Sequence, residues 1–443
     1  MNATSPRVTR AVSCRLGPVR LAVVAYATAT AIASLGCSSG VRVDREIPSG
    51  DAAPASAGPA PRWSTDETLA FLYAGEPSTW PTPVLGAEAM WQEFGPVPPV
   101  AHPAANPHSQ VKEELGRLLF HDGRLSGTGQ MSCASCHAPE LGWTDGRATS
   151  LGHGAEPVSR NAPTVLNSGH LAELFWDGRA SSLEELVQRV LHNPTEMRID
   201  AGQLVAGLAT SAEYRARFQQ AFGDPEPSLR RVVEAIACFV RTVVSDGSSP
   251  FDDFLRGERD ALSPAALRGL HLFRTRARCA NCHNGPLLSD GQFHDLGLSY
   301  YGRKLEDLGR YDTTGATADV GRFKTPSLRN VARTGPYMHN GLFDLPGVLN
   351  MYAAGMVTLR RNPEQADDPL FPTKSPLLAP VDLSEDDKQD LTQFLDSLTE
   401  RRRRVRVALP KFAEGPPAAD AAGATGAVDD VHKRGAMDED AGR

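Results

Sequence analysis

The sequence predicts a mainly α-helical, loop-rich fold built from two similar units. Apolar residues recur with helical spacing in several segments, whereas the alternating patterns typical of strands are scarce. The 40 Gly and 34 Pro among 443 residues predict unusually extensive loops. A Cys-x-x-Cys-His unit occurs twice, at 133–137 and 279–283, and each follows a similar helix end, "GRLLF" and "GLHLF". We therefore expect two related units, each with one Cys loop.

The first segment, residues 1–37, reads as an export signal. Four Arg and no acidic residue accompany an apolar run of about 16 residues, which is short for a membrane span. The run ends in "SLGC", which is similar to a bacterial lipobox, although Ser34 is a poor match. We expect a periplasmic protein. Ordinary cleavage and lipidation at Cys37, which would anchor the chain to the outer membrane, remain open alternatives.

The remaining chain divides into five segments by composition. Residues 38–62 are small, Pro-rich and polar and predict a disordered linker, and residues 63–105 form an N-terminal extension. Two helical units, 106–250 and 251–400, join where "SDGSSP" interrupts the pattern. Residues 401–443 begin with a basic run, read as a solvated helix end or else an electrostatic patch, and end in a tail predicted to be disordered.

Helical patterns cover five segments of the two units, one of which ends in "GLHLF". Several of them open with Ser or Pro, which are start signals for helices. The segments are 182–192, 229–244, 263–273, 345–355 and 384–399.

Charge and cysteine usage exclude two classes of protein. The net charge of −7 becomes −11 once the four Arg of the export signal are removed, so a nucleic-acid partner is not expected. Of the seven cysteines, Cys14 and Cys37 belong to the signal and four to the Cys units. Only Cys238 remains, in an apolar helical stretch that predicts a buried side chain. A disulfide framework is therefore not expected, despite export.

The two Cys units predict two covalently bound c-type haems. Each thiol can add to a haem vinyl group, and the adjacent imidazole lies where it can ligate the iron. A zinc site and a thiol–disulfide centre are the alternatives. Export favours haem over zinc, and the chain lacks the βαβ pattern of thioredoxin-like proteins. The predicted haem-binding residues are Cys133, Cys136, His137, Cys279, Cys282 and His283.

From about residue 111 to 398 the chain resembles the bacterial di-haem cytochrome c peroxidase and MauG superfamily. The motifs that carry this resemblance occur in the family's order: "LGRLLFHDGRLSGTGQMSCASCHAPELGWTDGR", "GHG", "RNAPTVLN", "FWDGRASSLEE", "NPTEM", "SLRNVARTGPYMHNG" and "LNMY". The resemblance implies two cytochrome c-like domains. The peroxidatic haem would lie in 106–250 and the electron-transfer haem in 251–400, with an electron path between them.

The resemblance also gives roles to four residues. Without it, three of them would be interpreted as ordinary surface or core residues. His137 would be the proximal ligand of the peroxidatic iron, and His153 in "GHG" looks like the residue that caps this iron in the resting form. Glu196 in "NPTEM" matches the family's distal acid, which would shift a proton between the two peroxide oxygens. Trp176 in "FWDGR" matches the tryptophan placed between the haems.

A calcium ion is implied between the domains. Asn161, together with the backbone oxygens of Thr334 and Pro336, matches the family's Ca²⁺ site. These are hard oxygen ligands of the kind that Ca²⁺ prefers.

The sixth ligand of the second iron, whose proximal ligand is His283, is either Tyr352 or Met351. Neighbouring helical residues differ by 100° in direction, so only one of the two can face the iron. The alignment with the family favours Tyr352. A phenolate would lower the reduction potential of this haem, whereas a thioether would raise it.

This choice separates the first two of three candidate functions, because Met351 would favour the first and Tyr352 the second. The first is a peroxidase that reduces H2O2 to water with electrons from a small cytochrome c or cupredoxin. The second is a MauG-like enzyme that uses H2O2 to oxidise a protein substrate. The third is a non-catalytic electron carrier, against which Glu196 argues. The resemblance also leaves open whether the protein forms a homodimer.

Overall fold

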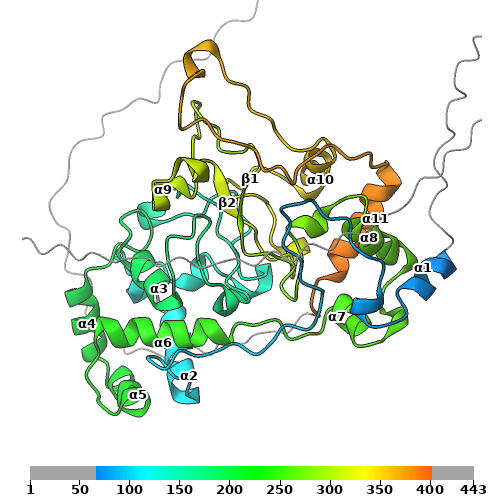
Figure 1. The fold of residues 1–443 in the computed structure, drawn as a ribbon. Coiled ribbons are helices and arrows are strands. Elements are labelled where there is room, and N and C mark those ends of the chain that lie inside the picture. Colours follow the sequence, from blue (N-terminus) through cyan, green and yellow to red (C-terminus); the bar gives the residue numbers. More distant parts are fainter. Residues whose placement is uncertain (1–65, 402–443) are drawn as a thin grey trace, which may run out of the picture. The chain divides into compact units, whose positions relative to one another are not determined.

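Helices dominate the part of the chain that the structure describes, as the sequence predicts. This computed structural model describes residues 66–401, which all fall in one unit beginning at Pro61. The predicted export signal, Cys37, the linker and the end of the tail lie outside the described residues. Figure 1 shows the fold. No helix among residues 66–401 has the length and apolar character needed to cross a membrane.

The helices and strands of residues 66–401 are the following. The α-helices are α1 (Asp66–Leu72), α2 (Gln110–Phe120), α3 (Leu183–His192), α4 (Ala201–Ala209), α5 (Ala212–Phe222), α6 (Leu229–Thr242), α7 (Pro250–Leu255), α8 (Pro264–Arg274), α9 (Tyr311–Thr314), α10 (Leu345–Ala353) and α11 (Glu385–Ser397), and the strands are β1 (Phe293–Asp295) and β2 (Arg322–Lys324). The two strands pair antiparallel, with Phe293 opposite Lys324.

Serine caps explain where the predicted helices begin. The five predicted segments appear as α3, α6, α8, α10 and α11. Ser182, Ser228, Ser263 and Ser384 each accept a hydrogen bond from the backbone amide three residues later. Such a bond satisfies one of the unpaired amides of the first turn and contributes about 1 kcal/mol.

The interruption between the two units contains a short helix that the sequence pattern did not predict. α6 ends at Thr242, and α7 begins at Pro250. Proline is well tolerated at the first position of a helix, because its missing amide would have no partner there. The side chain of Ser249 caps α7 by accepting from the amide of Asp252.

Each Cys unit follows a helix that crosses a later helix at a glycine. Gly116 of α2 faces α6, where a Cβ atom would lie 1.8 Å from the carbonyl oxygen of Ala235. Gly269 of α8 faces α11, where a Cβ atom would lie 2.0 Å from the carbonyl oxygen of Asp390. Both helix pairs therefore approach closely enough to exclude any side chain at the crossing, so the repeat seen in the sequence is also a repeat of packing.

Phenylalanine pairs support both crossings. The rings of Phe120 and Phe239 lie 5.3 Å apart, and those of Phe273 and Phe394 lie 5.1 Å apart, both edge to face. This geometry is favourable for aromatic pairs. Each pair joins the end of the helix that leads into a Cys loop to the later helix.

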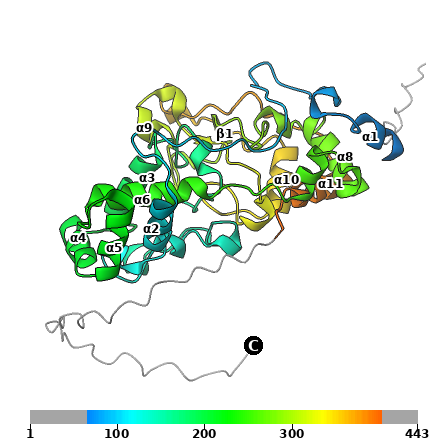
Figure 2. The same ribbon diagram turned by 90° about the horizontal axis from the view of Figure 1, so that it is seen from below.

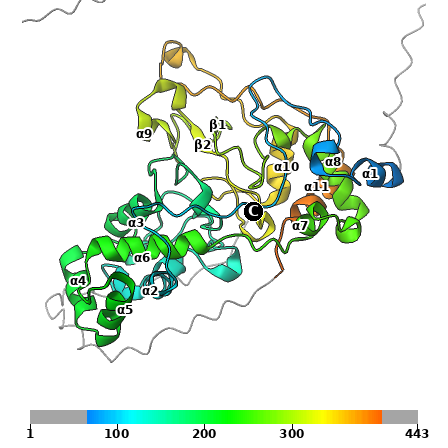
Figure 3. The ribbon, with the colours of Figure 1, turned by 60° about the horizontal axis from the view of Figure 1, so that its bottom comes forward.

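The buried apolar residues form two clusters. One is built from α2 to α6 and extends from Leu115 to Val243. The other is built from α1, α7, α8, α10 and α11 and ends at Leu398. Figures 1 and 3 show the same grouping, with β1 and β2 between the two sets of helices. In Figure 2, α5 lies between α2 and α4, and α10 lies beside α11. Cys238 of α6 is fully buried, as predicted.

Residues near the start of the described chain cover the second Cys unit. We call residues 84–94 the N-terminal strap. The amide of Gly86 donates to the side chain of Asn281 at 2.9 Å, and the amide of Gln92 donates to the side chain of Asn284 at 3.2 Å. The strap is thus hydrogen-bonded to the Cys loop itself, across about 195 residues of sequence.

Arg274 at the end of α8 holds the strap in place. This side chain is 1% exposed and forms an ion pair with Glu93 of the strap. Its guanidinium also lies 5.5 Å from the ring centre of Trp80 and 5.1 Å from that of Trp91. A buried cation with one carboxylate and two aromatic faces is well compensated.

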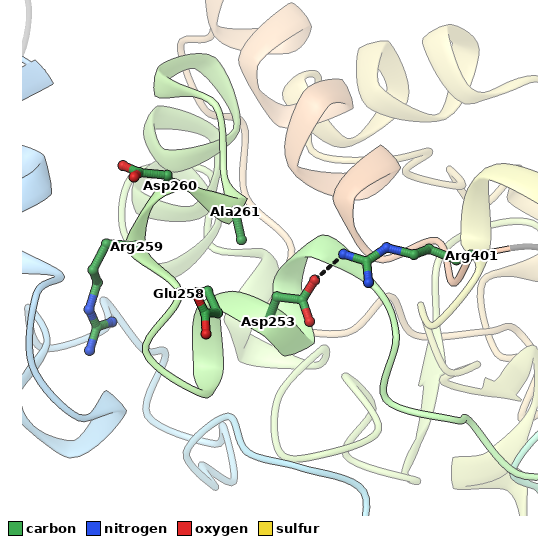
Figure 4. A pocket seen from close by; sticks show the side chains of 6 residues that line it. All are labelled: Asp253, Glu258, Arg259, Asp260, Ala261 and Arg401. Atoms are coloured by element: carbon green, nitrogen blue, oxygen red, sulfur yellow. Dashed lines mark hydrogen bonds and ion pairs between the residues drawn. The ribbon is translucent and has the colours of Figure 1, made fainter.

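The C-terminal end of the described chain is attached to α7 beside a surface cavity of about 420 Å³. Figure 4 shows Arg401 hydrogen-bonded to Asp253, with Glu258 and Asp260 also lining the cavity. The backbone amide of Arg401 donates to Ser248 at 3.2 Å. The arginine side chain is 71% exposed, so its ion pair contributes little stability.

Candidate haem sites

The first Cys unit lies in a single 3₁₀ turn, Cys133–Ser135, followed by Cys136 and His137. The Nδ1 atom of His137 lies 3.1 Å from the carbonyl oxygen of Trp143. Because a carbonyl can only accept, Nδ1 carries the proton and Nε2 keeps its lone pair. Burial lowers the pKa of His137, which favours the neutral imidazole. A neutral imidazole with Nε2 available is what an axial iron ligand requires.

The second Cys unit repeats this geometry. It occupies a 3₁₀ turn, Cys279–Asn281, followed by Cys282 and His283. The Nδ1 atom of His283 lies 3.0 Å from the carbonyl oxygen of Leu288, and burial lowers the pKa of this imidazole as well. Both histidines are therefore held in the same tautomer by a backbone carbonyl.

The four cysteine sulfurs are chemically suited to haem attachment rather than to thiol–disulfide exchange. All four are free thiols. Burial raises the pKa of Cys133 and of Cys279 to about 12. A redox-active Cys-x-x-Cys centre requires a lowered thiol pKa, so this alternative is disfavoured. Free paired thiols next to an oriented imidazole fit a c-type haem in each unit.

A zinc site at the second Cys unit would need a sulfur atom that haem attachment also needs. Among residues 66–401, the potential ligand atoms of Cys282, Asp290 and His294 lie within 4.8 Å of one another. His294 Nε2 lies 2.8 Å from Asp290 Oδ2. A thioether sulfur cannot also act as a thiolate ligand, and this group leaves out His283. The haem interpretation uses the complete motif, and the ion interpretation does not.

Two loops meet beside the first Cys unit and carry His153 and Glu196. The amide of His153 donates to the carbonyl oxygen of Thr195 at 3.1 Å. Gly152 lies against the same residue, since a Cβ atom there would lie 1.9 Å from the carbonyl oxygen of Thr195. The Nδ1 atom of His153 is buried and has no hydrogen bond. The structure thus packs the "GHG" loop directly on the "NPTEM" loop.

The Glu196 carboxyl group is close to the first Cys unit. Burial raises the pKa of Glu196, although the charge of Arg179 and a hydrogen bond from Asn193 oppose the shift. Burial also raises the pKa of Cys136, and the charge of Glu196 contributes to that rise. A half-buried carboxyl group with a raised pKa near Cys136 keeps its proton to a higher pH than an exposed glutamate does, which suits a group that exchanges protons.

Trp176 is held by residues from both halves of the sequence. Its indole Nε1 donates to the carbonyl oxygen of Asn161 at 2.9 Å. Its own carbonyl oxygen accepts from the amide of Lys324 in β2 at 2.8 Å. The ring of His339 lies 6.5 Å away between centres. The indole therefore lies where segments from before and after residue 250 meet.

The segments of the predicted calcium site also come together. The amide of Asn161 donates to the carbonyl oxygen of His339 at 2.7 Å, three residues beyond Pro336. The Asn161 side chain is buried, and its Nδ2 donates to the carbonyl oxygen of Arg147. The side chain of Thr334 lies against Gly142. Calcium binding by these residues stays a prediction.

Tyr352 of α10 lies beside the second Cys unit. Burial raises its pKa, and the neighbouring Cys282 and Cys279 contribute to the rise. The phenol is therefore near both sulfurs to which the second haem would be attached. Met351, the alternative ligand, is half-buried one position earlier.

An ion-pair network near Trp176 was not predicted. Arg160 donates to Asp307 at 2.7 Å and to Asp177 at 2.6 Å. Burial lowers the pKa of His339 to about 4, and its ring stacks on Phe323 at 3.6 Å. The position of His339 in the "MHNG" motif was a sequence signal for that residue. No such signal marks the ion pair of Arg160, because its partner Asp307 lies 147 residues away.

Comparisons with known proteins agree with this geometry. The family model of di-haem cytochrome c peroxidase matches residues 110–260. Cytochrome-c peroxidase IdrP1 of Pseudomonas sp. (strain SCT) is 38% identical over 335 residues, which cover 69% of this chain and 85% of that protein. The methylamine utilization protein MauG of Methylorubrum extorquens is 40% identical over 317 residues, which cover 71% of this chain and 84% of that protein. The solved structure of a MauG-like protein associated with microbial copper homeostasis matches with a TM-score of 0.62 and 35% identity, covering 69% of this chain and 93% of that one.

Proposed function

Because this chain belongs to the di-haem cytochrome c peroxidase and MauG superfamily, and is thus a peroxidase-type oxidoreductase, we propose that it reduces H2O2 to water in the periplasm. Electrons would pass from the C-terminal haem at His283 to the N-terminal haem at His137. The observation that carries this proposal is the half-buried Glu196 beside Cys136, with its raised pKa. The balance is H2O2 with two electrons and two protons giving two water molecules.

Glu196 handles the protons of this reaction. A haem held by Cys133, Cys136 and His137 would supply an iron that exchanges electrons with H2O2. The carboxylate of Glu196 accepts a proton from the near peroxide oxygen and returns it to the far oxygen. Burial raises its pKa, which makes the carboxylate a stronger base for accepting that proton.

His153 is the group that opens or closes this site. Its loop contacts the Glu196 loop through the amide of His153 and the carbonyl oxygen of Thr195. In the resting form His153 would cap the iron, which also gives its buried side chain a partner. When His153 leaves, the loop that carries Glu196 is free to adjust to peroxide.

Trp176 carries electrons between the two halves. An indole in the gap shortens the separate through-space distances that an electron must cross. Its hydrogen bond to Asn161 and its backbone contact with β2 fix the ring against both segments. The calcium ion at Asn161, Thr334 and Pro336 would stabilise the same junction.

The second candidate is a MauG-like enzyme that oxidises a protein substrate with H2O2. Tyr352 favours it, because its phenol lies near the sulfurs of Cys279 and Cys282. A phenolate ligand stabilises ferric iron and lowers the potential of the second haem. Such a haem shares oxidising equivalents more readily than it stores an electron from a donor.

Spectra of the purified di-haem protein separate these two functions. A peroxidase that needs reductive activation gains a high-spin signal after one-electron reduction and then turns over H2O2 with a small cytochrome c or cupredoxin. Immediate reaction of the fully ferric protein with H2O2, without turnover of any donor, would overturn the first proposal in favour of the second.

Replacing Tyr352 tests the ligand assignment. With Tyr352→Met we expect the potential of the second haem to rise, because a thioether replaces a phenolate. The spectrum of the first haem should not change. Met351→Leu is the matched control and should leave both potentials unaltered. If Met351→Leu changes the second haem and Tyr352→Met does not, the ligand is Met351.

The proposed location rests on the sequence outside residues 66–401. An export signal that ends near Cys37 would deliver the chain to the periplasm, where c-type haems are attached. Lipidation at Cys37 would add an outer-membrane anchor. Mass spectrometry of the mature N-terminus distinguishes lipidated Cys37 from ordinary cleavage.

A further inference from the structure

A second set of potential metal ligands lies at the end of α2 that is remote from the first Cys unit. A surface pocket of about 320 Å³ opens there. Its lining residues are Val100, His102, His108, Arg241, Thr242 and Val244. α2 has 11 residues, which corresponds to about 16 Å from its beginning beside this pocket to its end beside His137. The pocket is therefore separate from the haem site.

The two histidines of the pocket lie close together. The ring centres of His102 and His108 are 4.9 Å apart, and the ring planes are inclined by 52°. Two imidazoles that each bind one metal ion at about 2.0–2.1 Å have ring centres on the order of 5 Å apart. The observed separation is compatible with one ion bound by both rings.

A carboxylate orients one of the rings. The Nε2 atom of His108 lies 2.9 Å from Glu113 Oε2. With its proton directed at Glu113, Nε2 donates, and Nδ1 of the neutral ring keeps its lone pair. Metal-bound histidines commonly have this arrangement, in which a carboxylate accepts from the ring nitrogen that does not bind the ion.

The other ring has a buried nitrogen without a partner. The Nδ1 atom of His102 is buried and makes no hydrogen bond. Burial lowers the pKa of His102, and the charges of His108 and Arg241 lower it further. The lowered pKa favours the neutral imidazole, which is the form that ligates an ion. A buried polar atom without a hydrogen bond costs free energy that a bound ion would recover.

The positive groups around the pocket are compensated. Arg241 donates to both carboxylate oxygens of Glu184, at 2.7 and 2.5 Å. Lys112 donates to the side chain of Asn106 at 3.0 Å and lies near Glu113 in sequence. The carboxylates of Glu113 and Glu184 balance these two cations, so the local charge does not repel a divalent ion strongly.

We propose that His102 and His108 bind one divalent transition-metal ion through Nδ1 of each ring, with Glu113 orienting His108 and water completing the coordination. Imidazole nitrogens suit Cu²⁺, Ni²⁺ and Zn²⁺, and a site of this type binds Cu²⁺ most tightly. The site is independent of the peroxidase proposal, because none of its residues belongs to either Cys unit or has a role in the proposed peroxide reaction.

Titration of the full-length di-haem protein with CuSO4 tests the site. We expect one equivalent of Cu²⁺ to bind, with nitrogen hyperfine structure from two imidazoles in the electron paramagnetic resonance spectrum. His102→Ala and His108→Ala should each weaken this binding at least tenfold. Glu113→Gln should weaken it by about tenfold or more, because the orientation of His108 is lost.

His192→Ala provides the matched control, since His192 is exposed and lies on α3 rather than in the pocket. Its Cu²⁺ affinity should equal that of the unaltered protein. The haem absorption spectrum reports that each variant is folded and loaded. Unchanged Cu²⁺ affinity in a folded His102→Ala or His108→Ala protein, or an equal loss in His192→Ala, would overturn the proposal.

Discussion

Burial of the Glu196 carboxyl group changes its pKa and therefore the pH dependence of the proposed reaction. Its raised pKa means that the group is still partly protonated above the ordinary glutamate value of 4.5. Because the proton acceptor must be ionised, peroxide turnover should increase as the pH rises through this raised pKa. The pH profile of the enzyme therefore reports on one residue.

Glu196→Gln should abolish that acidic limb of the profile. Loss of the proton acceptor is expected to lower kcat by about 100- to 10,000-fold. Haem content and both reduction potentials should stay unchanged. Glu140→Gln, at an exposed position of the same unit, is the control and should retain full activity. A Glu196→Gln protein with normal turnover would remove this residue from the reaction.

Asp295 gives a second pH dependence, this time of stability. Burial raises its pKa from 3.8 to about 6, although the amide of Gly297 donates to it. The folded state therefore binds this proton more tightly than the unfolded state. Stability is greatest below about pH 4 for this group and falls as the pH rises to about 6, by about 3 kcal/mol in total.

Asp295→Asn should remove this fall, because the amide has the same shape and no charge to bury. The measurement is the difference in Tm between pH 4 and pH 7 for the variant and the unaltered protein. Asp367→Asn, at an exposed position, should leave the difference as it is. If Asp295→Asn keeps the same pH dependence, burial of this carboxylate is not its source.

At the level of helices, the crossings at Gly116 and Gly269 determine how closely the helix before each Cys loop packs on the later helix. Gly116→Ala would place a methyl group within 1.8 Å of the Ala235 carbonyl oxygen. The helices must separate, and we expect a loss of about 3 kcal/mol or more in the free energy of unfolding.

Gly207→Ala is the matched helical control for that substitution. Gly207 lies in α4, and no atom lies within 4 Å of the position where its Cβ would be. Alanine should therefore stabilise the protein by about 0.5–1 kcal/mol through helix propensity. Denaturant unfolding of both variants measures the contrast. Equal effects in the same direction would show that the α2–α6 crossing has room for a side chain.

Local signals allowed the helices to be predicted. Serine caps and periodic apolar residues are properties of short segments, so α3, α6, α8, α10 and α11 follow from the sequence. α7 was missed because its first residue, Pro250, reads as a breaker unless the Ser249 cap before it is considered. α4 and α5 have weaker patterns of apolar residues, and neither was predicted.

Across the whole molecule, contacts between distant segments were not predictable. The Cys units are contiguous motifs, so the haem-binding residues could be named from the sequence. The partners of Arg160 and Asn281 lie 147 and 195 residues away, and no periodicity marks them. The raised pKa values of Glu196 and Tyr352 likewise depend on burial by segments that fold over them.

The strap offers a prediction about the stability of the entire fold. Glu93→Ala would leave the buried Arg274 without its carboxylate, which costs about 3–5 kcal/mol. We expect residues 84–94 to detach and to be cut faster by an added protease, with a lower Tm. The Glu88→Ala protein, which is altered at an exposed position of the same strap, should be cleaved at the same rate as the unaltered protein. Equal cleavage in both variants would mean that Arg274 does not retain the strap.

The hydrogen bonds from the strap to Asn281 and Asn284 also impose an order on biogenesis. Thioether formation at Cys279 and Cys282 requires a porphyrin to reach both sulfurs while the surrounding chain is still open. Residues 84–94 leave the ribosome long before this loop, yet they can close over it only after the cofactor has entered. We therefore expect the strap to close after haem attachment in the C-terminal half, and an early closure to trap the apoprotein.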